Sequence, residues 1–257
     1  MDIVLKTQLG KIVYLTLNRG EKRNALSIEM INLLKDHFTA LNNDDSVRVI
    51  VLQANGDAFC AGADLGYLQQ LQKNTYEENL ADSHNLAELF KIIYTHQKIV
   101  ISMVEGAALA GGCGLATVCD LCYATVGSSF GYTEVKIGFI PAIVSFFLLR
   151  KIGEAKTKDL LLTGKIMDAT RASMMGLITS VIDANEIKMH VTQIAEKLCV
   201  ETSPSSISLT KNLINDIQSL NLEQAMQLAS ERNAQARSTD DCKRGIAAFL
   251  NKEKLKW

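Results

Sequence analysis

A repeated order of buried strand, glycine-bearing turn and helix is the feature that most constrains the fold of this chain. Residues 48–53 (RVIVLQ) are an apolar run that ends at the turn of residues 55–57, and residues 98–104 (KIVISMV) end at Glu105-Gly106. Short, continuous apolar runs bounded by turns are typical of buried strands. Because helical segments alternate with these strands, the chain is predicted to have an α/β fold. Ligands of such folds bind where glycine-bearing loops follow strands, so these turns are the first candidate sites.

The flanking segments fit the same class. Residues 3–5 and 12–17 are two apolar runs separated by Gly10, which predicts a β-hairpin. Ser27 is the expected N-cap of a helix whose apolar stripe runs from Met30 to Leu41 at spacings of three and four. Further along the chain we expect a polar, mobile stretch over residues 69–79 and helices over residues 79–94 and 115–119. Two short strands, residues 121–124 and 129–131, then precede a loop over residues 138–141 that leads to another helix.

The last third of the chain has a different pattern. From about residue 155 the strand signal nearly vanishes, apart from residues 178–182. Four helices are predicted there, over residues 185–200, 204–220, 222–237 and 240–252. The second begins with proline in its first turn, where proline is favoured. This pattern indicates an α/β core followed by a helical appendage that packs on the core or on a neighbouring subunit.

Charge and hydropathy exclude several classes of protein. The 257 residues carry 27 Lys+Arg and 28 Asp+Glu, a formal charge of −1, which gives no basic field for nucleic acid or anionic lipid. No stretch of about 18 uninterrupted apolar residues and no secretion signal is apparent. We therefore expect a cytoplasmic protein with neither a nucleic-acid nor a membrane partner.

The six cysteines lie mostly in apolar runs, which suits reduced, buried thiols. Cys119 and Cys122 form a C-x-x-C motif, and Cys113 is close to it in sequence. A structural zinc site needs four ligands, and the chain has no second C-x-x-C or H-x-x-H pair. No metal site is predicted.

Two glycine-bearing loops, residues 59–64 and 110–114, are candidates for backbone chemistry. Amides at the N-terminus of a helix have no partner within the helix. Two such amides that converge would form an oxyanion hole for negative charge on a carbonyl oxygen. Neither loop has the pattern of a dinucleotide site or a P-loop. The alternative is that both loops are tight turns used only for packing.

Glu134 is the one ionisable residue singled out for acid–base chemistry. It follows Gly131-Tyr132-Thr133 and precedes an apolar run. A carboxylate among apolar residues has a raised pKa, which suits a general acid or base near neutral pH. The alternative is an ordinary surface glutamate. The four histidines have neither the spacing of metal ligands nor a serine elbow nearby, so they are interpreted as structural.

Several of these segments, taken in order, resemble the enoyl-CoA hydratase/isomerase (crotonase) family. The resemblance spans practically the whole chain and continues through residues 163–164, 169–177 and 244–252. The segments that carry it are residues 24–26, 59–64, 104–112, 115–116 with 119–120, and 130–134 with 138–141.

This resemblance implies a ClpP-like spiral of ββα units over residues 1–190 that binds an acyl-CoA. It implies a helical trimerisation region over residues 191–257, in a homotrimer or a dimer of trimers. No separate cofactor is expected, because coenzyme A is part of the thioester substrate.

The family also implies roles for individual residues. The amides of Ala63 and Gly111 would form the oxyanion hole for the thioester carbonyl. Contacts with coenzyme A would come from two regions. The first comprises Lys22, Arg23, Ala25, Ala61, Asp64 and Leu65. The second comprises Phe249 and Lys252, on the C-terminal helices of this chain or of a neighbouring subunit.

The chain departs from the family at Gly114. Typical hydratases have a glutamate there and a second one twenty residues later, and this chain keeps only the second, Glu134. Two mechanisms remain open. Glu134 performs both proton transfers of a hydration, or the reaction needs one base, as in Δ3-Δ2 enoyl-CoA isomerisation.

Residues 133–142 (TEVKIGFIPA) and Gly114-Leu115-Ala116 are similar to bacterial methylglutaconyl-CoA hydratases. The favoured reaction is therefore the interconversion of 3-methylglutaconyl-CoA and 3-hydroxy-3-methylglutaryl-CoA. Tyr132, Thr133 and Lys136 are candidates to bind the distal carboxylate of that substrate. A hypothesis of another class is a non-catalytic protein that binds CoA esters or RNA.

Overall fold

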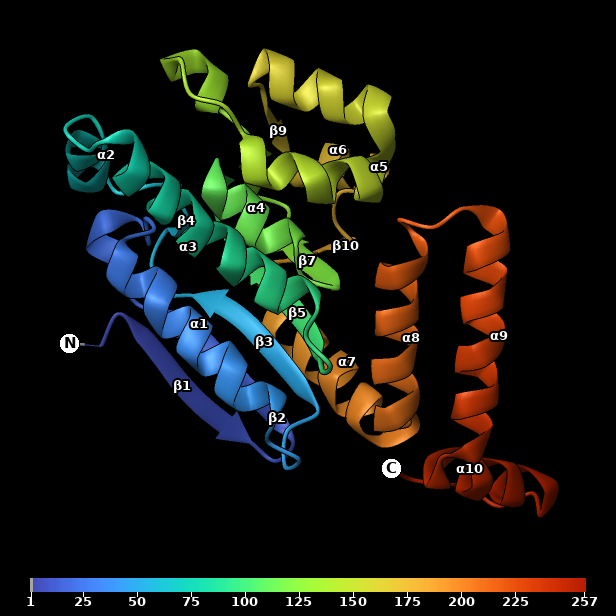
Figure 1. Cartoon of the computed structure of the whole chain (residues 1–257). Helices are drawn as coiled ribbons and strands as arrows, with labels where there is room; N and C mark the ends of the chain where they lie inside the picture. Colours follow the sequence, from blue (N-terminus) through green and yellow to red (C-terminus); the bar gives the residue numbers. More distant parts are fainter. Residues whose placement is uncertain (1) are drawn as a thin grey trace.

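A computed structural model describes residues 2–257, with the exception of the Leu65 side chain. Its main sheet has six strands in the order β1-β2-β3-β5-β7-β10. The hairpin pair β1–β2 is antiparallel and all the other neighbours are parallel (Figure 1). The strands are β1 (Val4–Leu9), β2 (Ile12–Leu17), β3 (Val49–Ala54), β5 (Ile99–Val104), β7 (Leu121–Thr125) and β10 (Ser180–Ile182).

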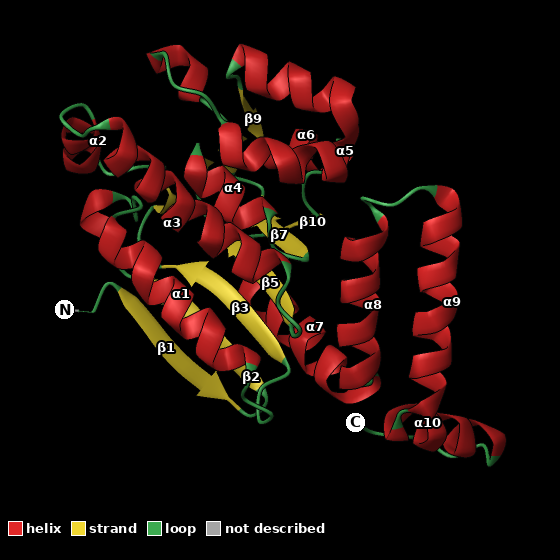
Figure 2. Ribbon diagram, in the orientation of Figure 1, coloured by secondary structure: helices red, strands yellow, loops and turns green. Residues whose placement is uncertain are grey.

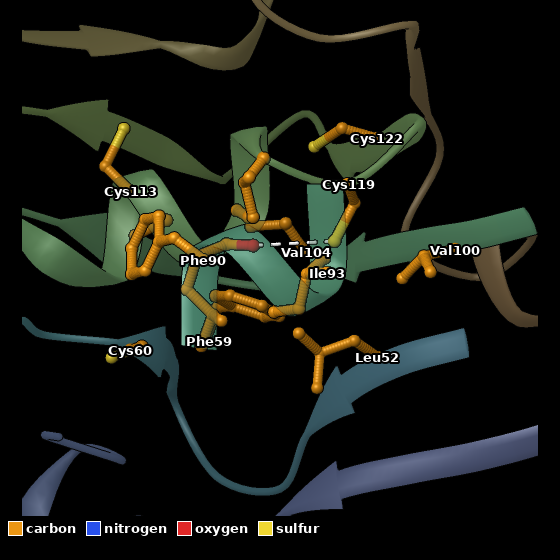
Figure 3. Packing of buried hydrophobic residues seen from close by; sticks show 14 of the residues in the cluster. Leu52, Phe59, Cys60, Phe90, Ile93, Val100, Val104, Cys113, Cys119 and Cys122 are labelled. Atoms are coloured by element: carbon orange, nitrogen blue, oxygen red, sulfur yellow. Dashed lines mark hydrogen bonds between the residues drawn. The ribbon is translucent and has the colours of Figure 1, made fainter. Parts of the chain in front are cut away.

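Both faces of this sheet are buried, and alternate residues serve the two faces. Ile50 and Leu52 of β3 belong to the larger hydrophobic cluster, together with buried residues of α1 (Ile28–Asn42) and α3 (Tyr76–Tyr94). Val49 and Val51 belong to a second cluster with the buried residues of α7 (Ile187–Glu201). Successive side chains of a strand point to opposite faces, so helices cover the sheet on both sides. Figure 3 draws part of the larger cluster.

A second, smaller sheet brings the glycine-bearing loops together. It has the order β4-β6-β8-β9, and its strands are β4 (Ala58–Cys60), β6 (Ala107–Leu109), β8 (Ser129–Gly131) and β9 (Ile166–Asp168). β4 and β6 follow β3 and β5 after tight turns, so each of these two strands of the large sheet continues into a short strand of the other sheet. The remaining elements of the core are η1 (Gly20–Lys22), α2 (Leu65–Leu71), α4 (Gly111–Thr117), η2 (Glu134–Ile137), α5 (Ala142–Thr163) and α6 (Ala169–Met174).

The last three helices form an arm that extends from the body (Figures 1 and 2). They are α8 (Pro204–Ile217), α9 (Leu222–Ser238) and α10 (Asp240–Leu250). Large apolar side chains remain exposed on α9 and α10, among them Leu222, Met226 and Phe249. The end of the chain returns to the body, where the Trp257 N–H donates to Val200 O at 3.0 Å.

The structure confirms most of the predicted elements. The hairpin, the Ser27 N-cap, which accepts from the Met30 N–H, and the four C-terminal helices are all present. Two predictions are wrong in detail. The stretch predicted to be polar and mobile contains the last three residues of α2 and the start of α3, and the helix predicted from residue 115 begins at Gly111. The division of the chain at residue 190 stays a prediction.

Candidate active site

The two glycine-bearing loops pack directly on each other. The Leu26 N–H donates to Gly62 O at 2.7 Å, and the Asp64 N–H donates to Leu26 O at 3.0 Å, which fixes the backbone on both sides of Ala63. A Cβ on Gly62 would lie 3.2 Å from Leu109 O, so the first loop lies against the end of β6. The structure thus brings Ala63 and the start of α4 to one place.

The amides of Ala63 and Gly111 are both unpaired. Within residues 2–257, neither N–H donates a hydrogen bond to the protein. Gly111 is the first residue of α4, where an N–H has no partner within the helix. Its predecessor Ala110 has φ 49 and ψ −126, an unusual backbone conformation for a residue with a Cβ. The Ala110 N–H donates to Gly131 O at 2.7 Å and so ties this turn to β8.

Gly112 permits this close approach of the loops. A Cβ at this position would lie 2.3 Å from Cys60 O and 2.7 Å from Cys60 Cβ. We expect Gly112→Ala to destabilise the protein by about 1–3 kcal/mol, because the backbone of β4 has to move. Urea unfolding measures the change, with Gly127→Ala as the control, since a Cβ on Gly127 meets nothing within 4 Å. Equal stability of the two variants would contradict the close packing.

Glu134 is linked to this pair of loops through β8, the strand that precedes it. It begins η2, three residues after β8, whose Gly131 O accepts from the Ala110 N–H. Its Oε2 is buried and has no hydrogen-bond partner among the described residues. Burial raises the pKa of this carboxyl above its usual value, as expected for a group that exchanges protons near neutral pH.

Gly114 lies in the interior of α4 and is fully enclosed by apolar side chains. A Cβ at this position would lie 2.4 Å from Val144 Cγ1 and 2.7 Å from Phe90 Cε1. The rings of Phe90 and Phe147 are 5.9 Å apart, which extends the apolar wall. The space that a second carboxylate needs is therefore filled by side chains of α3 and α5.

Of the three residues predicted to bind a distal carboxylate, Tyr132 has its hydroxyl engaged in the core. Tyr132 is completely buried, and its hydroxyl is 2.9 Å from Thr117 Oγ1. The aliphatic part of Lys136 packs on Gly164, where a Cβ would lie 3.2 Å from Lys136 Cε. Thr133 directly precedes η2 and accepts from the Lys136 N–H. That prediction is wrong for Tyr132, because its hydroxyl is used inside the core.

The segment predicted to hold coenzyme A is built around Asn24. Asn24 is fully buried, and its amide nitrogen donates to Asn55 O and Ala58 O, both at 2.8 Å. It places Lys22 and Arg23 on the surface beside the first loop, where the Ala61 N–H donates to Arg23 O at 3.0 Å.

Other residues predicted to contact coenzyme A lie close to this segment. Ala25 is buried, and Leu65 begins α2, with its side chain outside the described part of the structure. Asp64 caps α2 through the Gly66 and Tyr67 N–H groups and forms a 2.9 Å ion pair with Arg19. Arg19 was missed because no motif marks it.

Phe249 and Lys252 lie far from the rest of the predicted site within one chain. Phe249 is on α10, and Lys252 follows it with φ 57. Figure 1 places α10 at the far end of the arm, well away from α2 and β4. Phe249 is 82% exposed. One protomer therefore does not unite these two residues with Lys22 and Arg23.

The remaining reactive groups are structural. Burial raises the pKa of the Cys60 and Cys113 thiols to about 12, so both are protonated at neutral pH. His96 is buried, its Nε2 lies 3.0 Å from Phe38 O, and desolvation lowers its pKa to about 4. Among the described residues no group of three metal-ligating side chains is found, and no helix is long and apolar enough to cross a membrane.

Comparison with known proteins identifies the family. The family model described as enoyl-CoA hydratase/isomerase matches residues 7–257. The chain belongs to this family. Its fold is accordingly the α/β crotonase fold, with parallel strands in two sheets followed by C-terminal helices.

Relatives and solved structures agree with this assignment. The chain is 39% identical over 249 residues to a Thermus thermophilus protein with a provisional enoyl-CoA hydratase name, covering 97% of this chain and 98% of the relative. It is 32% identical to a crotonyl-CoA hydratase of Syntrophomonas wolfei, covering 98% and 96%. The crystal structure of an enoyl-CoA hydratase from Mycobacterium smegmatis matches with a TM-score of 0.94 at 28% identity, covering 100% and 99%. This chain is thus an enzyme of the enoyl-CoA hydratase/isomerase family, and binding of an acyl-CoA fits that family.

Proposed function

We propose that this enzyme hydrates an enoyl-CoA thioester and that Glu134 is its only side-chain acid and base. The observation that carries the proposal is that one chain combines a buried, unsatisfied Glu134 Oε2 with two unpaired amides, those of Ala63 and Gly111, in segments joined by the hydrogen bond from the Ala110 N–H to Gly131 O. The names of relatives such as the crotonyl-CoA hydratase of Syntrophomonas wolfei support hydration.

In this mechanism the thioester carbonyl oxygen accepts hydrogen bonds from the Ala63 and Gly111 amides. Water adds to Cβ of the enoyl group, and negative charge moves to the carbonyl oxygen as an enolate, which the amides stabilise. Glu134 accepts a proton from the attacking water and delivers it to Cα, so the carboxylate is regenerated. Preorganised donors of this kind contribute about 3–4 kcal/mol each.

Isomerisation is the second candidate, and the apolar wall at Gly114 favours it. With no room for a carboxylate there, Glu134 would remove a proton from C2 of a 3-enoyl thioester to give a dienolate. The same carboxyl would then return the proton to C4, which moves the double bond to C2=C3. The reaction in this case moves the double bond without adding any atom to the product.

The labelled-water experiment separates the two candidates. The enzyme is incubated with crotonyl-CoA and with a 3-enoyl-CoA in water enriched in ¹⁸O, and the products are analysed by mass spectrometry. Hydration of crotonyl-CoA gives a 3-hydroxyacyl product whose hydroxyl contains ¹⁸O from the water. Double-bond migration in the 3-enoyl-CoA, with no ¹⁸O in either product, would overturn hydration. Binding of RNA at physiological salt without turnover of any acyl-CoA would favour the non-catalytic hypothesis.

The sequence similarity of residues 133–142 favours 3-methylglutaconyl-CoA as the acyl substrate, whereas the side chains around η2 favour a substrate without a distal carboxylate. The distal carboxylate of 3-methylglutaconyl-CoA calls for a cation or hydroxyl donors. Tyr132 is committed to Thr117. A cavity lined by residues of α2 and its end, of α3 and by residues 137–139 lies beside η2, and its described lining contains neither Lys nor Arg. We therefore propose a substrate without a distal carboxylate. The same assay compares turnover of 3-methylglutaconyl-CoA, the competing substrate, with turnover of crotonyl-CoA.

The position of α10 supports an oligomer in which the arm of one subunit reaches the coenzyme A site of another. In this proposal Phe249 and Lys252 contribute to a neighbour's site, in a homotrimer or a dimer of trimers. The exposed apolar residues of α9 and α10 would be covered in such an assembly.

A further inference from the structure

A cavity of about 540 Å³ lies where the arm joins the body, at the edge of the main sheet opposite to the glycine-bearing loops. Residues at the starts of β3 and β5 form one wall, and the end of α7, the start of α8 and the junction of α9 and α10 form the others. Figure 1 shows the chain passing from α7 into α8. The loops follow the other ends of β3 and β5, and a strand of this length spans about 20 Å. The cavity is therefore separate from the candidate active site.

Two cations, Arg48 and Lys98, line this cavity from neighbouring strands. Each directly precedes its strand, and Val49 of β3 is the register partner of Ile99 of β5. Neighbouring strands are about 4.8 Å apart, so the two basic residues start from adjacent backbone positions. Like charges in such positions repel each other, and an anion bound between them would remove this repulsion.

The described chain neutralises neither cation. Within residues 2–257, Arg48 and Lys98 form no ion pair. Arg48 Nε is buried and has no hydrogen-bond partner among these residues. A buried donor without an acceptor is costly, so a ligand that brings an acceptor is favoured. Asp45, an exposed residue, is the one acid in the described lining, which therefore keeps a net positive charge.

The other polar side chains of the cavity are neutral hydroxyls and amides, which bond to phosphate oxygens and to hydroxyl groups alike. They are Gln97, Thr202, Ser205, Ser208, Gln235 and Thr239. The first turn of α8 is not itself the anion site, because Asp241 accepts from the Ser205 N–H at 3.2 Å and from the Ser205 hydroxyl at 2.8 Å. The volume of the cavity is in the range typical of pockets for small organic molecules.

We propose that this cavity binds a phosphate monoester of a small hydroxylated compound, such as a sugar phosphate. Arg48 pairs with phosphate oxygens through parallel hydrogen bonds, and Lys98 acts on them as a point charge. The hydroxyls and amides of the lining, among them Gln97 of the body and Ser208 of the arm, bond to the hydroxylated part. A ligand in this place contacts both the body and the arm, so it stabilises their junction.

Isothermal titration calorimetry on the whole chain tests this site with ribose 5-phosphate, inorganic phosphate and ribose. We expect ribose 5-phosphate to bind roughly tenfold more tightly than inorganic phosphate, and ribose to show no binding at the same concentration. Saturating coenzyme A should leave the Kd of ribose 5-phosphate unchanged, because the described lining shares no residue with the segments predicted to hold coenzyme A. Displacement of ribose 5-phosphate by coenzyme A, or no binding of it at all, would overturn the proposal.

Single substitutions locate the ligand in the cavity. Arg48→Gln and Lys98→Gln each remove one cation and should weaken binding of ribose 5-phosphate by at least roughly tenfold. Lys188→Gln removes an exposed cation of α7 outside the described lining and should leave this Kd unchanged. Thermal melting without ligand verifies that each variant folds. An unchanged Kd in the folded cation variants, or an equal loss in Lys188→Gln, would contradict the site.

Asp45→Asn tests the sign of the charge in the cavity. Loss of the carboxylate removes a repulsion, so inorganic phosphate should bind about threefold more tightly. Glu77→Gln, a change of an exposed carboxylate on α3 outside the described lining, should leave the Kd of phosphate unchanged. Weaker binding of phosphate by Asp45→Asn would contradict recognition by the two cations.

Discussion

Glu134→Gln is expected to lower turnover of the enoyl-CoA substrate by at least roughly a hundredfold, the contribution of a positioned acid or base. Glutamine keeps the shape of the side chain but transfers no proton. The oxyanion amides of Ala63 and Gly111 are backbone groups, so the Kd for acyl-CoA should change little. Steady-state kinetics and calorimetry measure the two quantities on the same preparation.

The same substitution has a predictable effect on stability. Because burial raises the pKa of Glu134, its ionised form is less favourable in the folded protein than in the unfolded chain. The penalty is absent below the unfolded-state pKa and develops as the pH rises through the folded-state pKa. Glu134→Gln should therefore melt at or above the wild-type temperature at neutral pH, and this difference should disappear in acid.

The pH dependence of activity gives an independent check. If Glu134 acts as a base in the rate-limiting step, kcat/KM falls as the pH drops through its raised pKa. Glu77→Gln, a change of an exposed carboxylate on α3, should follow the wild-type profile. Turnover by Glu134→Gln within a factor of about three of the wild type would remove Glu134 from the mechanism.

Gly114→Glu is expected to damage the protein and not to create a two-carboxylate site. The new Cβ would lie 2.4 Å from Val144 Cγ1 and 2.7 Å from Phe90 Cε1, and the carboxylate would be buried among apolar groups. Overpacking alone costs about 1–3 kcal/mol. A lower urea midpoint and a loss of turnover are the expected results.

The control for this variant is Gly127→Glu, because a Cβ on Gly127 meets no atom within 4 Å. It should unfold at nearly the wild-type urea concentration. Faster hydration by Gly114→Glu, with unchanged stability, would show that the wall of Phe90 and Val144 yields to a larger side chain and would contradict the enclosed environment described for Gly114.

Local signals were sufficient for the elements with strong patterns. The buried runs of β3 and β5, the Ser27 cap and the amphipathic C-terminal helices follow from spacing and capping alone. β4, β6 and β9 were missed; each has three residues, too few to display a period, although β8 of the same length was predicted. The start of α4 was missed because three glycines near its beginning hide a helix that tertiary packing stabilises.

The candidate site was predictable as a set of residues but not as an arrangement. Motifs pointed to Ala63, Gly111 and Glu134, and the departure at Gly114 was visible in the sequence. No sequence pattern reveals that Phe90, 24 residues away, occupies the space next to Gly114, or that Glu134 Oε2 has no donor. Such facts depend on long-range packing, which one sequence does not encode in a local pattern.

The contact between Phe90 and Gly114 also makes the effects of changing these two positions non-additive. A larger residue at position 114 is disfavoured while the phenyl ring is present, and a smaller residue at position 90 leaves a cavity while glycine is present. A double-mutant cycle with Phe90→Ala and Gly114→Ala should therefore give a favourable coupling energy. In evolutionary terms, a descendant of this chain acquires a side chain at position 114 most easily after position 90 has become smaller, so the order of the two substitutions matters.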